Sequence, residues 1–556
     1  MKKLILFCLL VTSVASAQVI RGPYLQSPTS ASIKIMWRTA TNTDSEVMYG
    51  TSASNLVFEA TDTNQVANHT VAITGLQPNT KYYYSVGTTT QTLSGPDSLH
   101  HFKTSPVIGT IQPINFWAMG DFGRGSNNQR LVRNSFEAVH DTFNTDFWLW
   151  LGDNVYNDGT DLEYSTKVFD SIYGYHRLMK YLPFMPSPGN HDYNVISTPQ
   201  ASVHPDNQVG PYFDLVDVFT NGECGGVPSG TEKYYSFNYG NVHFISLNSE
   251  LYSIANPSHD WIGASPINTF NGSPFIDWLA ADLAANTQTW IVAYWHQSPH
   301  TDGSHHSAYP WEISMKAMRE RICPMLESYG VDLILTGHSH VYERSYLIHN
   351  YFGVPNDFDP AQHIVDSNTG DYTTGNSYVK YKEGPNAGVG TIYAVVGAGG
   401  SEESDPGMQH PAMFFNYGCE NCVGSLLVTV HGDTLKGQYL KGNGEITDHF
   451  GIIKKQTEPT SVSLIPSSVA ALIVYPNPTH KNFSIQLTLT KDSPCQLQLF
   501  DMQGKLVKDL CTATELKKGE HKLTFSIDEL GMQTGVYLVK YSDGTKVYSR
   551  ALVVEE

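Results

Sequence analysis

The chain has 556 residues and a formal net charge of −19, with 40% hydrophobic and 12% aromatic residues. This length exceeds that of one compact domain, and the hydrophobic content is typical of packed globular cores rather than of disorder. The acidic charge argues against nucleic-acid binding, which depends on basic patches, but it does not exclude small phosphate esters whose charge a metal can neutralise.

The first 17 residues have the pattern of a signal peptide. Lys2 and Lys3 precede an apolar run at 4–11, and Ala15-Ser16-Ala17 is a small-residue cleavage site. The run is too short for a transmembrane helix, and no later stretch approaches membrane-spanning length. We therefore expect an exported protein that is soluble or is held at the cell surface by another element.

Six cysteines follow the predicted cleavage site, and an exported chain permits disulfides between them. The pair Cys419 and Cys422, separated by two residues, has the spacing of a redox or zinc pair. No second pair of this spacing accompanies it, so a structural disulfide is the favoured interpretation.

Residues 18–106 are predicted to form an all-β domain. Ile33, Ile35 and Trp37 alternate with polar residues, broken only by Met36, which is typical of a half-buried strand. The run Leu76-Gln-Pro-Asn-Thr-Lys-Tyr82 resembles the corner of fibronectin type III domains, where a tyrosine hydroxyl bonds back to the backbone. No catalytic set is present, so we predict a fibronectin-like β-sandwich.

The pattern changes at residue 107, where strands begin to alternate with helices. A helix is expected between the first two strands, with Val132, Phe136, Val139 and Phe143 on its apolar face. Ser273-Pro274 predicts the start of a second helix, and a third is expected at about 311–329. The predicted strands are 114–119, 147–151, 182–185, 242–247, 290–295 and 331–337. Strand, helix, strand is typical of a layered α/β domain.

Five of these strands end in an Asp, Asn or His side chain, and in open α/β sheets ligands bind at the carboxyl ends of strands. The candidate metal ligands are Asp121, Asp153, Tyr156, Asn190, His296, His338 and His340. The last two are separated by one residue and suit either one metal or two neighbouring metals. Seven ligands suit two ions with one shared carboxylate, and their oxygen and nitrogen donors suit iron, zinc or manganese better than calcium.

The remaining segments differ in composition. Residues 347–390 are rich in Asn, Asp, Gly and Tyr, so we expect a long surface insertion near the site mouth or a lid. Residues 391–400 return to the sheet, and strands through 453 close the catalytic domain at 107–453. Residues 454–468 are predicted to be a polar linker, and residues 469–556 a second β-domain.

The motifs GDFG, GDNVY, GNHD, WHQSP and GHSH, in this order, resemble the five metal-binding blocks of purple acid phosphatases, within the calcineurin-like metallophosphoesterase superfamily. The resemblance covers roughly residues 114–400. It implies an α/β (α+β) core in which a two-sheet sandwich is flanked by helices. It also implies a ferric ion bound by Asp121, Tyr156 and His340, a divalent ion (iron, zinc or manganese) bound by Asn190, His296 and His338, and a bridge through Asp153.

The same resemblance implies that His191 contacts substrate phosphate. His305 and His306 lie nine and ten residues beyond His296, where the family carries a substrate-binding and proton-donating pair, and which of the two donates is open. Other branches of the superfamily place a histidine two residues after the first aspartate. Here that position is Gly123, and Tyr156 takes its place, which favours the purple branch because a phenolate suits Fe(III).

The function implied is that of a secreted binuclear-metal acid phosphatase, which hydrolyses small phosphate monoesters by attack of a metal-bound hydroxide. The alternative is a phosphodiesterase or nucleotide-hydrolysing enzyme at the same site. A non-enzymatic surface protein with a vestigial site would be indicated by missing ligands, and none is missing.

The tail carries Tyr475-Pro-Asn-Pro478, Leu499-Phe-Asp-Met-Gln-Gly504 and Gly535-Val-Tyr-Leu-Val-Lys540. These runs resemble the C-terminal sorting domain of the bacterial type IX secretion system, over about residues 469–556. The resemblance implies a partner in the secretion machinery, passage across the outer membrane, removal of the tail, and release or surface attachment. The alternative is a β-module with a binding role.

Overall fold

The computed structural model forms two compact units, residues 1–458 and 459–556. The structure describes residues 17–193, 208–250, 274–401, 410–417, 423–457, 469–494, 496–501, 505–511, 515–542 and 547–555. Nearly all of the predicted signal peptide lies outside these residues, as do Cys419, Cys422 and Cys495. Within them, Cys224, Cys323 and Cys511 carry free thiols, and none of the helices is long and apolar enough to cross a membrane.

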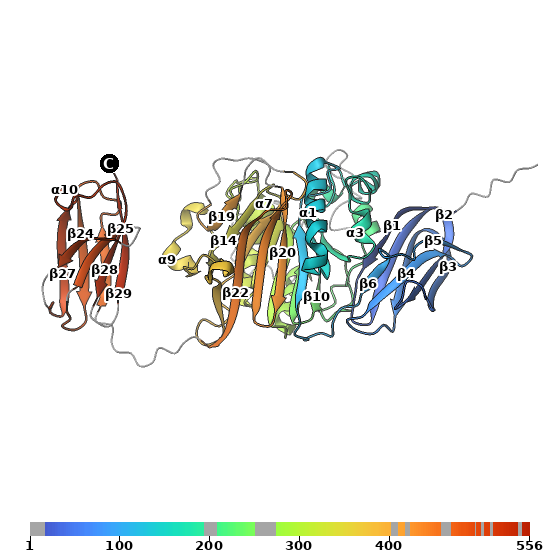
Figure 1. Cartoon of the computed structure of the whole chain (residues 1–556), viewed down its shortest axis with the longest axis horizontal. Helices are drawn as coiled ribbons and strands as arrows, with labels where there is room; N and C mark the ends of the chain where they lie inside the picture. Colours follow the sequence, from blue (N-terminus) through green and yellow to red (C-terminus); the bar gives the residue numbers. More distant parts are fainter. Residues whose placement is uncertain are drawn as a thin grey trace, which may run out of the picture. The chain divides into compact units, whose positions relative to one another are not determined.

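The N-terminal domain is a single six-stranded sheet (Figure 1). Its strands are β1 (Val19–Gln26), β2 (Ser32–Gly50), β3 (Phe58–Thr74), β4 (Lys81–Thr88), β5 (Gln91–Ser94) and β6 (His101–Lys103). Irregular pairing between Arg38 and Ser45 divides the long β2 into a first half that pairs with β1 and a second half that pairs with β4. The hydroxyl of Tyr82 accepts a hydrogen bond from the N–H of Gln77 (3.0 Å), the contact expected of the tyrosine corner.

The N-terminal sheet packs directly against the catalytic domain. Tyr24 donates a hydrogen bond to the carbonyl of Leu215 (3.0 Å), and the side-chain amide of Gln26 donates to the carbonyl of Phe184 (2.8 Å). Tyr24 also belongs to the main core of the catalytic domain. Arg21 extends this contact with a hydrogen bond of 2.7 Å to Asp161.

The catalytic domain is built on two seven-stranded sheets, ordered β17-β22-β21-β20-β7-β8-β9 and β10-β11-β12-β13-β18-β14-β19. The first contains β7 (Ile114–Met119), β8 (Phe147–Leu151), β9 (Phe184–Ser187), β17 (Tyr378–Glu383), β20 (Gly424–His431), β21 (Thr434–Lys441) and β22 (Ile446–Thr457). The second contains β10 (Tyr235–Tyr239), β11 (Val242–Ser246), β12 (Trp290–Gln297), β13 (Leu333–Gly337), β14 (Tyr342–Ser345), β18 (Ile392–Val396) and β19 (Met413–Tyr417). The second sheet is parallel at its centre, along β11-β12-β13-β18, and the first sheet is parallel at one end, along β7-β8-β9.

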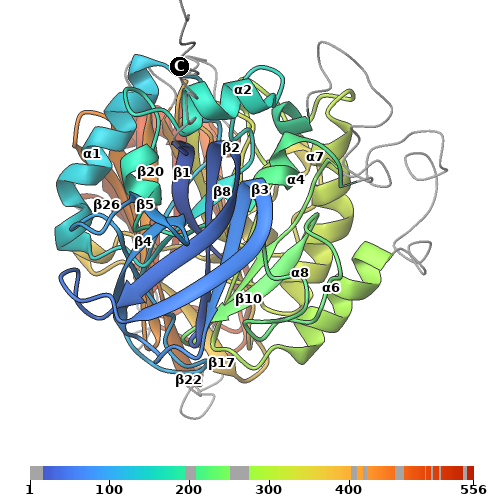
Figure 2. The same cartoon turned by 90° about the vertical axis from the view of Figure 1, so that its right-hand side faces the viewer.

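Helices cover the outer faces of the two sheets, α1 on one side and α6, α7 and α8 on the other (Figure 2). They are α1 (Asn127–Phe143), α6 (Pro274–Ala285), α7 (Ile313–Ala317) and α8 (Cys323–Ser328), with the π-turn η5 (Met318–Ile322) joining the last two. Shorter turns are α2 (Asp161–Glu163), η1 (Tyr164–Val168), α3 (His176–Met179), η2 (Asn190–Tyr193), α4 (Pro211–Leu215), η6 (Pro355–Asp357), α9 (Pro360–His363) and η7 (Tyr372–Thr374). This confirms the predicted two-sheet sandwich flanked by helices.

Strand β12 explains why the core strands have unbroken apolar sequences. Trp290, Val292 and Tyr294 pack in the main core, while Ile291, Ala293 and Trp295 pack against the helices on the outer face. Because successive side chains of a strand point to opposite faces, burial of both faces requires apolar residues at every position.

The segment 347–390 is only partly the surface insertion that its composition predicts. It contains β15 (Leu347–Ile348), β16 (Ile364–Asp366) and β17, and β17 pairs in parallel with β22 as the edge strand of the first sheet. Edge position leaves its alternate side chains partly exposed, so the apolar signal of this strand is weak. Tyr351 stacks on His300 of the loop after β12, with ring centroids 4.8 Å apart.

The predicted linker at 454–468 is wrong in its first four residues, because β22 extends to Thr457. Lys454 donates a hydrogen bond of 2.7 Å to the buried carboxylate of Asp332, which also binds Lys380 at 2.8 Å. Lys454, at the start of this polar stretch, therefore belongs to an ion pair between the two sheets, while residues 455–457 are exposed at the end of β22. Residues 458–468 lie outside the described part of the chain.

The C-terminal unit has two sheets around one apolar core, as predicted for a β-sandwich. A three-stranded sheet contains β23 (Val469–Tyr475), β24 (Asn482–Leu489) and β27 (Gly519–Ser526). A four-stranded sheet contains β25 (Gln496–Asp501), β26 (Leu506–Cys511), β28 (Gly535–Ser542) and β29 (Val547–Val554), and α10 (Ile527–Leu530) follows β27. Ile485, Leu487, Leu499 and Val539 are buried between the two sheets.

Candidate metal centre

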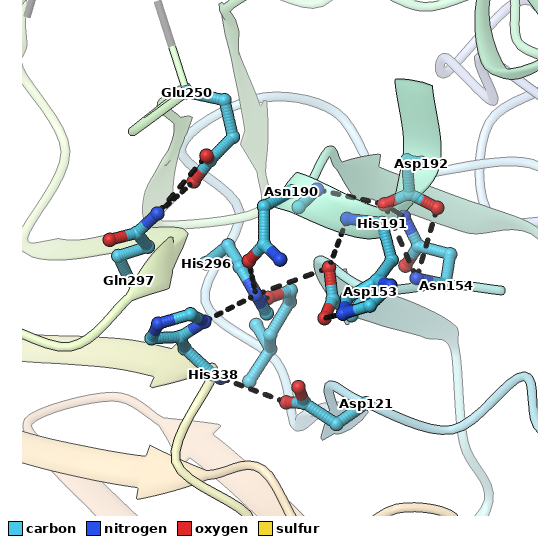
Figure 3. Close-up of polar contacts among 12 residues, drawn as sticks. Asp121, Asp153, Asn154, Asn190, His191, Asp192, Glu250, His296, Gln297 and His338 are labelled. Carbon is cyan, nitrogen blue, oxygen red and sulfur yellow. Dashed lines mark hydrogen bonds and ion pairs between the residues drawn. The ribbon is translucent and has the colours of Figure 1, made fainter. Parts of the chain in front are cut away.

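The seven predicted ligands converge at the carboxyl ends of β7, β8, β9, β12 and β13, where the two sheets meet. Figure 3 shows Asp121, Asp153, Asn190, His296 and His338 grouped together. Hydrogen bonds join the two sheets directly at this point. The backbone N–H of His338, after β13, donates to Oδ2 of Asp121, after β7, over 2.9 Å. The side chains come from positions up to 219 residues apart in sequence, and only the sandwich brings them together.

Three of these residues have left-handed backbone conformations. Asp121 has φ of 60°, Asp153 of 48° and His338 of 70°. Such values are uncommon for non-glycine residues and cluster at functional sites, where the surrounding structure holds them in place. Here each one turns the chain sharply just after a strand ends, and the acidic or imidazole side chain is thereby turned toward the shared edge.

The glycine of the GDNVY motif is required by close packing. Gly152 has φ of +86°, and a Cβ added to it would lie 2.5 Å from the Cβ of His296. Glycine is the residue that tolerates both conditions. Replacement at this position would push His296 out of the site.

The Nε2 atom of His296 is surrounded by acceptor atoms. Asn190 Oδ1 lies 3.1 Å from it and Asp153 Oδ1 lies 3.2 Å from it. His338 Nδ1 lies 3.2 Å away on another side. Since Nδ1 of His296 already donates to the carbonyl of Leu151, a proton on Nε2 can satisfy only one of these neighbours. A cation satisfies all of them, so this donor set fits a metal ion.

A second group of ligands surrounds the hydroxyl of Tyr156. This hydroxyl donates to Oδ1 of Asp121 over 2.8 Å and lies 3.2 Å from Nε2 of His340. Arg124 packs over the Tyr156 ring at 3.7 Å and places its guanidinium 3.2 Å from the same nitrogen of His340. The position two residues after Asp121 is occupied by Gly123, where a side chain would collide with the carbonyl of Asn154.

The pKa shifts of the site show that its centre favours positive charge. Burial lowers the pKa of His296, but Asp153 and Asp121 outweigh this effect and raise it to about 10. Burial raises the pKa of Asp153, yet His296 and His191 bring it well below its usual range. The pKa of Tyr156 is raised well above its usual value by burial and by the two aspartates. Two carboxylates held this closely favour cations.

Of the three predicted catalytic histidines, His191 lies against the ligands themselves. Its backbone N–H donates to Asp153 Oδ1 over 2.8 Å, and its ring lies 4.5 Å from that of Tyr156. Nδ1 donates to the carbonyl of Asn157 over 2.6 Å. This contact orients Nε2, which lies 3.8 Å from Asp153 Oδ2.

The neighbouring His305 and His306 have different surroundings. The ring of His305 lies 3.8 Å from the ring of His338, and its Nδ1 lies 2.8 Å from Oε1 of Glu312. His306 accepts a hydrogen bond at Nδ1 from the N–H of Ala308 and pairs at Nε2 with Asp302 over 2.8 Å. Both ring nitrogens of His306 are thus engaged, whereas Nε2 of His305 has no hydrogen-bond partner among the described residues.

Two acidic residues of this site were missed by the sequence interpretation. Glu312 lies between His305 and His338, with Oε2 3.6 Å from Nε2 of His338. Burial raises the pKa of this carboxyl, but the two histidines lower it to about 2. Because Glu312 lies in a turn before α7, outside every motif, no local signal identifies it.

Asp192 completes the GNHD motif and organises the backbone of the site. Its carboxylate accepts hydrogen bonds from the N–H groups of Gly189 (2.7 Å) and Asn154 (3.1 Å) and from the hydroxyl of Tyr164 (2.6 Å). Burial and the nearby Asp153 raise its pKa to about 7. Because Asp192 stands next to Asn190 and His191 in the GNHD motif, the sequence could have identified it as a site residue.

Three family models match the chain. Residues 114–342 match the model of calcineurin-like phosphoesterases, and residues 22–104 match that of the purple acid phosphatase N-terminal domain. Residues 473–555 match that of the secretion system C-terminal sorting domain. Residues 114–342 therefore form a domain of the calcineurin-like phosphoesterase type, preceded by a domain of the purple acid phosphatase N-terminal type. The chain also carries a type IX sorting domain at residues 473–555.

Known relatives agree with this assignment. Purple acid phosphatase 15 of Arabidopsis thaliana is 28% identical over 313 residues, which cover 51% of this chain and 50% of that protein. Phosphoenolpyruvate phosphatase of Allium cepa is 24% identical over 377 residues, covering 65% of this chain and 64% of that one. The chain thus spans about half the length of the first relative and under two thirds of the second.

The fold is shared with a solved structure. Purple acid phosphatase PPD1 from yellow lupin superposes with a TM-score of 0.55 at 20% identity, covering 79% of this chain and 77% of that one. At this identity the likeness concerns the fold alone.

Proposed function

We propose that the protein is an exported acid phosphatase that hydrolyses small phosphate monoesters at a centre of two metal ions. The observation that carries the proposal is the convergence of seven donor side chains from five strand ends around two adjacent points. One is beside His296 and the other is beside Tyr156. Family membership supports a centre of two metals.

The ligand assignment follows these two groups. Asp121, Tyr156 and His340 would hold a ferric ion, since a phenolate and a carboxylate are hard donors suited to it. Asn190, His296 and His338 would hold a divalent iron, zinc or manganese ion, with Asp153 shared between the two. When bound, the ions would lower the pKa of a water molecule so that it can act as the nucleophile, and they would neutralise charge on the phosphoryl group.

The histidines would act on the substrate. His191, exposed on one side of the ligands, would donate to a phosphoryl oxygen. We assign His305 as the residue that donates a proton to the leaving alcohol. Glu312 orients the ring of His305 through Nδ1 and leaves Nε2 for the substrate. His306, held by Asp302 and Ala308, would position the loop.

The proposal is tested by metal analysis of the purified protein and a substrate panel of monoesters, diesters, nucleotides and phytate. We expect two metals per chain, with iron present, and faster hydrolysis of monoesters than of diesters, with more activity in acid than at neutral pH. A preference for diesters would favour the alternative phosphodiesterase. A metal-loaded protein that hydrolyses none of these esters would overturn the enzymatic proposal.

The variant His338→Ala provides the matching test of the ligand set. Removing one imidazole from the divalent site should reduce metal content and phosphatase activity together. His349→Ala is the control, because His349 is a half-exposed histidine that pairs with Glu327 outside the site. Full turnover with the His338 variant would contradict the ligand role.

A further inference from the structure

Two large aromatic side chains are exposed in the turn that follows the catalytic histidines. Tyr309 is 43% exposed and Trp311 is 66% exposed. The other tryptophans in the described ranges are buried. An exposed indole keeps a large apolar face in water, and neighbouring exposed aromatic groups often mark binding sites.

A row of rings runs from the pair to His306 of the catalytic loop. The ring of Tyr309 lies 4.9 Å from that of His306, and the ring of Trp311 lies 4.6 Å from that of Tyr309. The next residue, Glu312, reaches back to His305 and His338. The aromatic pair therefore begins at His306, which is next in sequence to the proposed proton donor His305.

The backbone of this turn is well held. The N–H of Tyr309 donates to the carbonyl of His306 over 2.9 Å, and the N–H of Glu312 donates to the carbonyl of Tyr309 over 3.1 Å. Pro310 restricts the chain between the two aromatic residues. A platform held in this way loses little conformational freedom when a ligand binds.

We propose that Tyr309 and Trp311 form a stacking subsite for a flat aromatic group on the leaving alcohol. The base of a nucleoside monophosphate is such a group. This inference rests on the proposed function, which sets the phosphate beside the metal ligands. Hydrolysis then forms a bond from water oxygen to phosphorus and breaks the phosphorus–oxygen bond to the ribose. The nucleoside leaves with one proton and stays in contact with the platform.

The test compares AMP with ribose 5-phosphate, which have the same ester linkage and differ in the base. We expect the wild type to have a lower KM for AMP. Trp311→Ala should raise the KM for AMP roughly tenfold, a typical effect of losing one base–aromatic contact, and leave that for ribose 5-phosphate unchanged. Trp311→Phe should retain most of the preference, because a flat ring remains.

Tyr329→Ala is the matched control, since Tyr329 is also exposed (42%) but precedes β13 at the end opposite to His338. It should change neither KM. Equal loss with both substrates in Trp311→Ala, or no loss with either, would overturn the stacking subsite while the phosphatase proposal stands.

Tryptophan fluorescence tests binding at the stacking subsite independently of the proposed phosphatase activity. Adenosine should quench tryptophan emission of the wild type and of Tyr329→Ala, and the quenched component should be missing in Trp311→Phe. If the wild type hydrolyses neither ester, the proposed function fails, and this binding result alone decides the subsite. Identical quenching in all three proteins would reject it.

Discussion

Individual residues of the metal centre are held in arrangements that are costly without a cation. Asp121 and Asp153 are buried, and the acceptor atoms of Asn190 and His338 face the same nitrogen of His296. Burying unpaired charges and acceptors is unfavourable. The site is therefore arranged for ligand binding rather than for stability.

Replacing Tyr156 tests the identity of the metal beside it. If Tyr156 binds Fe(III) as a phenolate, the metal-loaded protein absorbs visible light by charge transfer, and Tyr156→Phe abolishes this band. The measurement is an absorption spectrum with iron content determined on the same sample. Tyr239→Phe serves as control, because Tyr239 is a buried tyrosine whose hydroxyl contacts Asp146 elsewhere. A colourless, iron-free and fully active wild type would reject the assignment.

Comparison of His305→Ala with His306→Ala tests which histidine donates the proton. Loss of a general acid slows hydrolysis of poor leaving groups by about 10²–10⁴-fold and affects a nitrophenyl ester much less. We expect this selective loss of kcat with alkyl phosphates in His305→Ala only. The opposite pattern would transfer the role to His306.

At the level of elements, the site depends on the two sheets keeping their relative position. The buried pair of Arg344 in β14 and Asp448 in β22 is one connection between them. Nε of Arg344 donates to Oδ2 of Asp448 over 2.6 Å, Nη2 donates to Oδ1 over 3.0 Å, and Tyr342 donates to Oδ2 over 2.8 Å. Such a bidentate pair fixes geometry as well as charge.

Asp448→Asn should lower the free energy of unfolding by about 3 kcal/mol, because it leaves the guanidinium of Arg344 buried without its counter-charge. The measurement is urea-induced unfolding. The control is Asp433→Asn, which breaks the surface pair with Lys382 and should cost less than about 1 kcal/mol. Equal effects of the two variants would show that the buried pair does not stabilise the sandwich.

The whole molecule separates the proposed metal centre and the sorting domain into two units. The first 458 residues form one compact unit and the remainder forms another, each with its own apolar core. The N-terminal sheet, in contrast, shares core residues and hydrogen bonds with the catalytic domain. Only the C-terminal unit is therefore expected to be dispensable for folding of the metal centre.

A chain truncated after Glu458 should keep the phosphatase activity and thermal unfolding midpoint of the first unit. It should accumulate in the periplasm instead of outside the cell, because the sorting domain is missing. Activity and location are measured in cell fractions of a host with the type IX system. Continued secretion of the truncated chain would contradict the sorting role, and loss of activity would contradict the independence of the units.

Several features could be predicted from the sequence because they depend on local patterns. Apolar runs buried on both faces indicate the core strands, and the polar residues directly after them indicate the proposed ligands Asp121, Asp153 and His338. The tyrosine corner at Tyr82 follows in the same way from one short motif. Strands and the turns that follow them are specified by neighbouring residues, so their positions and polar side chains can be predicted from the sequence.

The tertiary structure decided what depends on distant partners. The polar sequence around Lys454 predicts a linker, but Lys454 lies in β22 and pairs with Asp332, 122 residues away, next to β13 of the other sheet. Glu312 lies outside every motif and reaches the site only because the turn before α7 folds against β13. The sequence by itself determined most of the core strands, the seven candidate donors and the resemblance to purple acid phosphatases. The packing of two sheets decided which donors face each other, because those contacts join residues that no local pattern relates.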